Sequence, residues 1–317
     1  MGCENYLLDS PRFLISFSGM SAGLKILPAI HYAIILFALA LALPGRGAGT
    51  NEFSEMKSLA ETGDAQAQLI VSEMLAKGQG TAADPVAAEK WCRQAAEHDL
   101  ALAQYSLGVM LERGADSSRN EAEAAKWYRR AAEKGVAPAQ CALGGMYETG
   151  RGVGTNLPVA VIWYSKAAEK GHAEAQYRLG LTYARKDSTR EDFATAVKWF
   201  TLAAEQGHAL AQFKLGGLYY DGRGVAQDYI VAARWYRKAA ERGVGEACFN
   251  LGLMSGYGQG MKQNYPEAYK WFTLAAWRGN ELAMDNREVL AAEMKPEQIA
   301  EARRLATEFA EVNRIRH

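Results

Sequence analysis

The sequence has little proline, few cysteines and no excess of charge of either sign. Only 8 of its 317 residues are proline. β-Branched residues are also few, a composition that favours helices over strands. Lys and Arg together number 36, as do Asp and Glu, so the formal net charge is zero. We therefore expect no nucleic-acid partner, because phosphate binding requires a clear basic excess.

The four cysteines follow no regular interval and form no Cys-x-x-Cys pair; they are Cys3, Cys92, Cys141 and Cys248. This spacing argues against a disulfide framework and against a thiolate metal site. We interpret the last three as small core residues on helices, where free cysteines are usually found.

Residues 1–49 differ from the rest of the chain. Lys25 precedes an apolar run, 26–43, and small residues follow it, which is the pattern of a secretory signal peptide over about residues 20–48. Met20 is the start that this pattern predicts, which would leave 1–19 as an extension. The alternative is an uncleaved membrane anchor, because the run is close to the lower limit for spanning a bilayer.

The remainder repeats itself every 36 residues. Tryptophan marks the six copies, at Trp91, Trp127, Trp163, Trp199, Trp235 and Trp271. Ala-Ala follows each Trp after four residues, and Gly follows after eight in five copies. A Gln precedes a Leu-Gly pair with the same period. An unbroken period of this length is the signature of a solenoid.

Each copy predicts two helices, here called helix A and helix B. Helix A carries the Gln and the Leu-Gly pair, a Gly-x-Gly loop usually follows, and helix B carries Trp and Ala-Ala. The closing Gly is expected in the left-handed conformation. Trp and the aromatic residue after it are expected to supply most of the buried area. We predict a capping half-repeat at 50–63, six repeats at 64–279 and capping helices at 280–317. The last helix should bury a stripe of Ile299, Ala302, Ala306, Phe309 and Val312.

These motifs resemble the Sel-one-like repeat, a relative of the tetratricopeptide repeat. The segments that carry the resemblance are Ala175-Gln-Tyr-Arg-Leu-Gly180, Gly222-Arg-Gly-Val225 and Trp235-Tyr-Arg-Lys-Ala-Ala-Glu-Arg-Gly243. The resemblance implies an all-α, right-handed superhelical solenoid of antiparallel helix pairs that acts as an adaptor between proteins. Two copies depart from the loop motif, at Gly114-Ala-Asp116 and at Lys186-Asp-Ser188, where we expect different loops.

Motifs for catalysis and for cofactors are missing. The sequence contains no H-E-x-x-H and no G-x-S-x-G. The Gly-x-Gly loops lack the strand and the Gly-Lys-Ser of a phosphate site. His172 and His208 occupy equivalent places in adjacent repeats, which stacked helices separate by roughly 10 Å, too far apart for one zinc ion. We predict no cofactor, no metal and no enzymatic activity. The alternative is a secreted hydrolase-like enzyme whose site escapes recognition.

Function should then lie on positions that differ between copies, since repeated positions build the core. Three such rows lie on roughly one side of helix A, which lines the concave side of helical-pair solenoids. The predicted partner-binding residues are Ile70, Lys77, Arg113, Arg178, Arg185, Lys214, Asp221, Asn250 and Tyr257. Reversing the charge of Arg178, Arg185 and Lys214 should weaken partner binding without lowering the melting temperature. The alternative is that these are only tolerant surface positions. The sequence thus predicts a periplasmic or secreted scaffold for a protein or peptide, anchored to the membrane only if 26–43 is retained.

Overall fold

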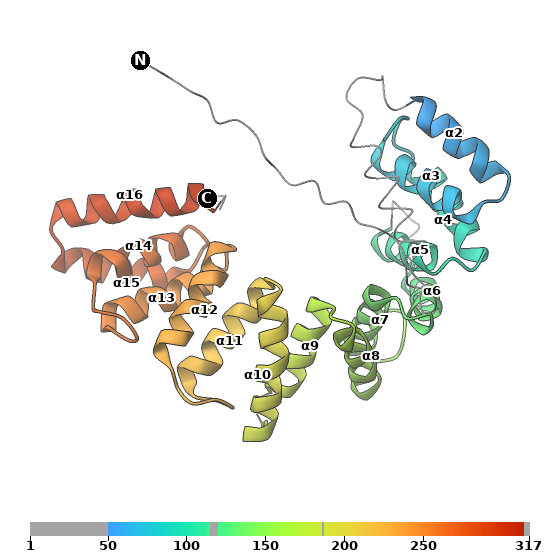
Figure 1. Cartoon of the computed structure of the whole chain (residues 1–317). Coiled ribbons are helices and arrows are strands. Elements are labelled where there is room, and N and C mark those ends of the chain that lie inside the picture. The colour runs from blue at the N-terminus through green and yellow to red at the C-terminus, as the bar shows by residue number, and fades with distance from the viewer. Residues whose placement is uncertain (1–49, 115–119, 186, 314–317) are drawn as a thin grey trace, which may run out of the picture. The chain divides into compact units, whose positions relative to one another are not determined.

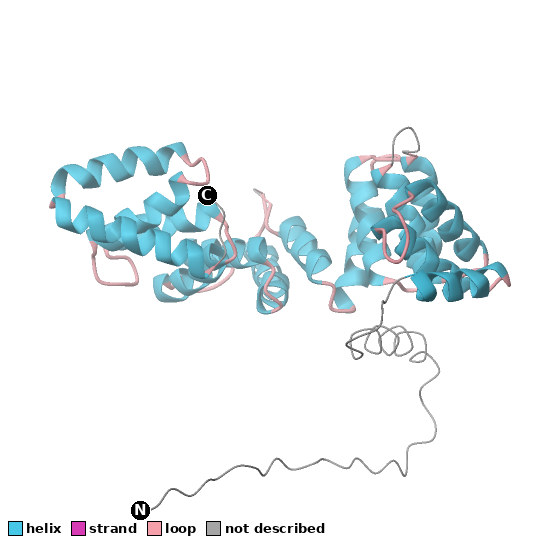
Figure 2. Ribbon diagram, turned by 90° about the horizontal axis from the view of Figure 1, so that it is seen from above, coloured by secondary structure: helices cyan, strands magenta, loops and turns pink. Residues whose placement is uncertain are grey.

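A computed structural model describes residues 50–114, 120–185 and 187–313. The predicted N-terminal extension and signal peptide, 1–49, lie outside these ranges, as do Ala115 and Asp116 of the irregular loop in the second repeat. Every regular element in the described part is a helix (Figure 2).

Twelve of the described helices form six consecutive pairs (Figure 1). Helices A are α3 (Ala65–Lys77), α5 (Ala101–Arg113), α7 (Ala137–Thr149), α9 (Ala173–Tyr183), α11 (Ala209–Asp221) and α13 (Gly245–Tyr257). Helices B are α4 (Pro85–Glu97), α6 (Glu121–Glu133), α8 (Leu157–Glu169), α10 (Arg190–Glu205), α12 (Tyr229–Glu241) and α14 (Tyr265–Ala276). From α3 to α14 each helix packs against the next one in the chain. The fold is the all-α solenoid of helix pairs that the period predicted.

The glycine of each Leu-Gly pair lies where an aromatic ring of helix B occupies the space of a side chain. A Cβ at Gly180 would lie 2.6 Å from the ring of Phe200. The same relation joins Gly108 to Tyr128, Gly144 to Tyr164, Gly216 to Tyr236 and Gly252 to Phe272. In the first repeat Ser72 takes the glycine's place and Cys92 takes that of the ring. The smaller Cys92 leaves room for the hydroxyl of Ser72, which donates a 2.7 Å hydrogen bond to the carbonyl oxygen of Ala88.

The residue after each Trp, rather than the Trp itself, is the most deeply buried aromatic of the second to fifth repeats. Tyr164 and Phe200 are almost fully buried, whereas four of the six tryptophans that mark the repeats are only half-buried: Trp91, Trp163, Trp199 and Trp235. The aromatic residue after the Trp is therefore the more deeply enclosed of the two in these repeats. Trp127 and Trp271 are buried, and Trp271 most deeply, because Phe309 of α16 (Pro296–Val312) packs edge-on against it at 5.0 Å between ring centroids.

Buried glutamines tie five of the six helices A to the helix before them in the chain, and Cys248 takes the place of the glutamine in α13. Nε2 of Gln140 donates a 3.0 Å hydrogen bond to the carbonyl oxygen of Ala132, near the end of α6. Gln68, Gln104, Gln176 and Gln212 make the same bond to the alanine eight residues earlier. Each of these carbonyl oxygens also accepts the backbone N–H three residues later, so the glutamine adds a second hydrogen bond at the end of the preceding helix. This explains why Gln recurs with the period.

The Gly-x-Gly loops have a packing role. Gly258 ends α13 in the left-handed conformation, and its N–H bonds to the carbonyl oxygen of Met254. Gly260 also has a positive φ, and a Cβ there would lie 2.5 Å from the carbonyl carbon of Tyr229, at the start of the preceding repeat's helix B. The second glycine thus permits close contact between backbones of neighbouring repeats.

The loop of the fourth repeat differs from the others, as its sequence predicted. Helix α9 stops at Tyr183, and α10 begins early, at Arg190. Thr189 and Asp192 form a capping box that fixes this earlier start. As a result α10 has 16 residues, against 12 or 13 in the other helices B.

The ends of the array are closed by α2 (Thr50–Glu61), α15 (Glu281–Glu293) and α16. Helix α16 packs against α14 and buries Ala302, Ala306 and Ala310. Val312 is 81% exposed, so its placement in the buried stripe is wrong. The buried face continues through residues four apart, whereas Val312 comes two residues after Ala310 and points to the opposite side of the helix.

Candidate partner-binding face

The predicted partner-binding residues lie on the surface of helices A or in the loop after α9. Six are exposed: Lys77, Arg113, Arg185, Lys214, Asp221 and Tyr257. Three are half-buried: Ile70, Arg178 and Asn250. Leu102 and Leu210 lie in one of the same variable rows and are 44% and 46% exposed. We call these eleven residues the A-face.

Arg185 is not on a helix, so its placement on the helical face is wrong. Helix α9 ends at Tyr183 with Ala184 as its C-cap, where other copies continue for two residues. The backbone N–H of Arg185 donates a 2.9 Å hydrogen bond to Oγ of Ser188 in the loop. The side chain is nevertheless exposed.

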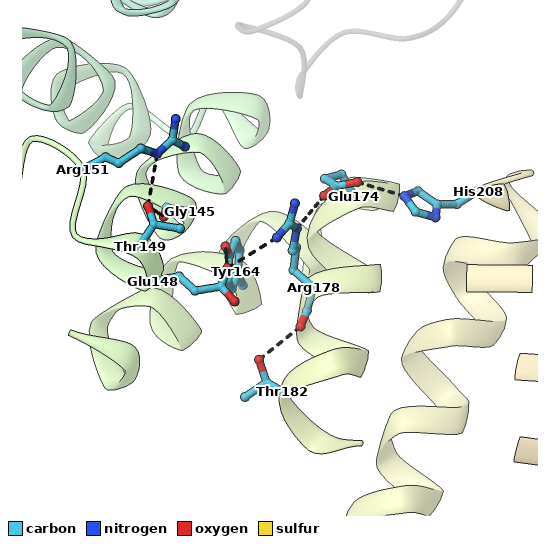
Figure 3. A network of polar contacts seen from close by, with 9 residues as sticks. All are labelled: Gly145, Glu148, Thr149, Arg151, Tyr164, Glu174, Arg178, Thr182 and His208. Carbon is cyan, nitrogen blue, oxygen red and sulfur yellow. Dashed lines mark hydrogen bonds and ion pairs between the residues drawn. The ribbon is translucent and has the colours of Figure 1, made fainter. Parts of the chain in front are cut away.

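Arg178 is the centre of a polar network that joins three repeats (Figure 3). Its Nε donates a 2.6 Å hydrogen bond to Oε1 of Glu174, one turn earlier on α9. Its Nη1 lies 3.6 Å from Oε2 of Glu148, on α7 of the preceding repeat. Arg178 is therefore held between two carboxylates. Its charge reversal would place three carboxylates together, so the expectation of an unchanged melting temperature does not suit this residue.

His208 extends the network to the next repeat. Its Nδ1 accepts a 3.1 Å hydrogen bond from the backbone N–H of Ala211 and so caps α11. The proton of the neutral ring must then be on Nε2, which lies 2.9 Å from Oε2 of Glu174 and donates to it. The ring also stacks on Tyr177 at 4.6 Å between centroids. The hydrogen bond from His208 to Glu174 is the largest cause of the lowered pKa of Glu174. Burial opposes this lowering, and Arg178 adds to it. The two histidines singled out in the sequence are thus helix caps.

Buried tyrosines connect the core to this surface, which the sequence did not predict. The hydroxyl of Tyr164 donates a 2.6 Å hydrogen bond to Oε2 of Glu148. Burial and this bond raise the pKa of Tyr164 far above its usual value. Tyr128 makes the equivalent 2.8 Å bond to Glu112 in the repeat before. In the fourth repeat, where Phe200 lacks a hydroxyl, the place of Glu148 is taken by Ala184. In the sequence the Tyr and the Glu occur together in the second and third repeats and are both absent from the fourth, whereas the fifth repeat breaks the pattern with Tyr236 and Tyr220.

The remaining A-face residues differ in how freely they can meet a partner. Lys77 and Asp221 have nearby charged neighbours, Glu73 at 3.5 Å and Arg223 at 3.6 Å. Burial raises the pKa of Tyr236 to about 12. The hydrogen bond between Tyr236 and Asn250 acts in the opposite direction on this pKa. Other members are free of ion pairs within the described residues: Arg113, Arg185, Lys214 and Tyr257. Tyr257 is 74% exposed.

Chemically reactive groups are not gathered on this surface. In the ranges that the structure describes, no three His, Cys, Asp or Glu side chains are grouped so that they could hold a metal ion. Burial raises the pKa of the Cys92, Cys141 and Cys248 thiols to about 12, which disfavours their thiolate forms. No helix among residues 50–313 is long and apolar enough to cross a membrane.

Stacked helix pairs with a repeated core and a varied surface define the class of helical-repeat interaction proteins. Within that class the chain belongs to the Sel1 repeat family. The family model matches six times, at residues 65–100, 101–136, 137–172, 173–208, 209–244 and 245–280. Sel1 repeat proteins are generally non-catalytic scaffolds for protein interactions.

Two solved structures support the assignment. One is a protective antigen present in uropathogenic Escherichia coli strains displaying an SLR fold, with 33% identity and a TM-score of 0.81. The match covers 88% of this chain but only 60% of that protein. The other is a Sel1 repeat protein from Oxalobacter formigenes, with 30% identity, a TM-score of 0.68 and coverage of 82% and 76%. A search of curated proteins finds no match.

Proposed function

We propose that the chain is a non-catalytic scaffold that binds a protein or peptide on its A-face. The observation that carries the proposal is the division between repeated and varied positions. Repeated positions are used in packing, as Gly180 against Phe200 and Gln140 against Ala132. Varied positions such as Lys214, Leu210 and Tyr257 are exposed and differ in chemistry along the array. Such a surface distinguishes one partner from another without altering the fold.

The chemistry of the A-face fits a partner with both apolar and charged side chains. Leu102 and Leu210 offer exposed apolar area, and Lys214 and Arg185 offer cations that have no carboxylate partner among the described residues. The fixed network of Arg178 supplies rigidity at the centre of this surface instead of a free charge. We expect Tyr257 to contribute strongly, because exposed tyrosines often dominate interface energies.

The proposal places the scaffold in the periplasm or outside the cell. Its support is the apolar run 26–43 with a preceding Lys and small residues after it. N-terminal sequencing of the protein recovered from fractionated cells tests this step. A mature end between about residues 43 and 50 supports export with cleavage. An intact N-terminus in the membrane fraction would instead support the anchored form.

Site-specific photo-crosslinking tests the face itself. A photoreactive amino acid replaces Tyr257 or Lys214 in the living cell, and a matched variant carries it at Lys126 on helix B of the second repeat. We expect an adduct with one protein from the A-face positions and no such adduct from Lys126. An adduct formed only from Lys126 would contradict the A-face assignment.

A further inference from the structure

The outward side of α10 carries a basic, an apolar and an acidic residue in line. Lys198, Leu202 and Glu205 are spaced four and three residues apart, so they share one side of the helix. All three are exposed, Leu202 to 45%. Within the described residues neither Lys198 nor Glu205 makes an ion pair or a hydrogen bond through its side chain. We call these three residues the α10 strip.

The same places on other helices B are filled differently. In α6, α8 and α12 the middle place carries a cation: Arg130, Lys166 and Lys238. Each of these cations lies over the ring of the Trp three residues earlier, at 4.5, 4.3 and 4.3 Å from its centroid. Only in α10, among the helices B from α6 to α12, is the middle place apolar.

The α10 strip is complementary to itself. Lys198 and Glu205 are seven residues apart, which is about 10 Å along the helix. Their midpoint falls within one residue of Leu202. If a second α10 lies antiparallel across the first, Lys198 of each copy meets Glu205 of the other, and the two Leu202 side chains meet at the centre. A two-fold axis produces this arrangement, because the same patch then serves both copies.

We propose that the chain forms a two-fold symmetric dimer through the α10 strip. The apolar centre with charged flanks is the usual anatomy of a protein interface. Helices α6, α8 and α12 would place two cations against each other at the axis. In α4 the place carries Gln94, and in α14 it carries the buried Leu274, so α10 is the helix B selected. This contact lies on helix B, so it is independent of the A-face proposal.

Sedimentation equilibrium of the purified protein and its variants, over a wide range of concentration, tests the dimer. Lys198→Glu should weaken self-association by roughly tenfold or more, since it replaces two exposed ion pairs by two repulsions. Glu205→Lys should weaken it similarly. Mixing the two variants should restore association, because one copy then presents two acids and the other two bases.

Two further variants separate the strip from general effects of charge. Lys126→Glu changes the equivalent place on α6 and should leave self-association unchanged. Leu202→Asp should abolish it, while far-UV circular dichroism and the melting temperature show that the fold is kept. A wild type that stays monomeric at all concentrations would overturn the proposal. So would a dimer that persists in both Lys198→Glu and Leu202→Asp, or single variants that do not associate when mixed.

Discussion

The hydroxyl of Tyr164 lies 2.6 Å from Oε2 of Glu148 and joins the core of the third repeat to its surface. The ring of Tyr164 fills the space above Gly144, and its hydroxyl reaches the carboxylate that also faces Arg178. One residue therefore packs two helices together and orients the polar network of the A-face.

Replacing Tyr164 by Phe should destabilise the protein by about 1–2 kcal/mol, because a hydrogen bond to a charged acceptor is lost. Urea unfolding monitored by circular dichroism measures the change. The double variant with Glu148→Ala should lose less than the sum of the two single variants. Strict additivity would show that the two groups are not coupled.

Two adjacent glycines on α7 offer a matched comparison. A Cβ at Gly144 would lie 2.8 Å from the ring of Tyr164, whereas at Gly145 its nearest neighbour is the Tyr164 hydroxyl at 3.5 Å. Gly144→Ala should cost about 1–3 kcal/mol through overpacking. Gly145→Ala should be neutral or stabilise by up to about 1 kcal/mol through helix propensity. Thermal unfolding of both variants decides, and equal effects would refute the close-packing explanation of the repeated glycine.

Acidification should weaken the link between His208 and Glu174. The hydrogen bond from His208 lowers the pKa of Glu174 in the folded state, and Arg178 lowers it further, against the effect of burial. A lowered folded-state pKa gives stability that is present at neutral pH and is lost as the pH falls through that pKa. The gain is modest, below about 1 kcal/mol, since the side chain is partly exposed.

The comparison with Glu174→Gln tests this link. Wild type should melt at a higher temperature than the variant near neutral pH. The difference should shrink as the pH falls below the usual pKa of a glutamate and disappear below the lowered pKa of Glu174. A difference that does not change with pH would mean that the charge of Glu174 contributes nothing.

Charge reversal at two cations of the A-face should affect the melting temperature differently. Arg178→Glu places a third carboxylate beside Glu174 and Glu148 and should lower the melting temperature. Lys214 has no carboxylate partner within the described residues, so Lys214→Glu should leave the melting temperature unchanged. Differential scanning fluorimetry distinguishes the two. A stable Arg178→Glu variant would show that the network does not support the fold.

The fold could be predicted from the sequence because the same helix-pair motif recurs in all six repeats. Trp, Ala-Ala, Leu-Gly and the closing Gly recur at fixed spacing. The glycines of the Leu-Gly pairs lie against aromatic rings, and the closing glycines have a positive φ. The shift of burial from Trp to the next residue could not be read from periodicity. Trp235 and Tyr236 are adjacent aromatics, and only the position of the neighbouring helix decides which one is enclosed.

The candidate site was less predictable, because variation between copies marks an exposed position without showing its neighbours. Arg178 and Lys214 are equivalent in the repeat, yet carboxylates from two helices hold Arg178, whereas Lys214 has no ion pair in the part of the chain that the structure describes. The difference depends on Glu148 and Glu174, which lie 30 and 4 residues away. Arg185 likewise lies outside the helix because α9 already ends at Tyr183, before the irregular loop of the fourth repeat.

Partner binding through varied residues of the A-face is the central claim to be tested. The direct measurement is the affinity of the crosslinked partner, once purified, for wild type and for two double variants of equal stability. Lys214→Glu with Tyr257→Ala should weaken binding by at least about a hundredfold, as expected when an aromatic side chain is removed from an interface and a charge in it is reversed. Lys126→Glu with Arg234→Glu, on helices B, should leave the affinity unchanged. Loss of binding in the helix B variant alone would contradict the account.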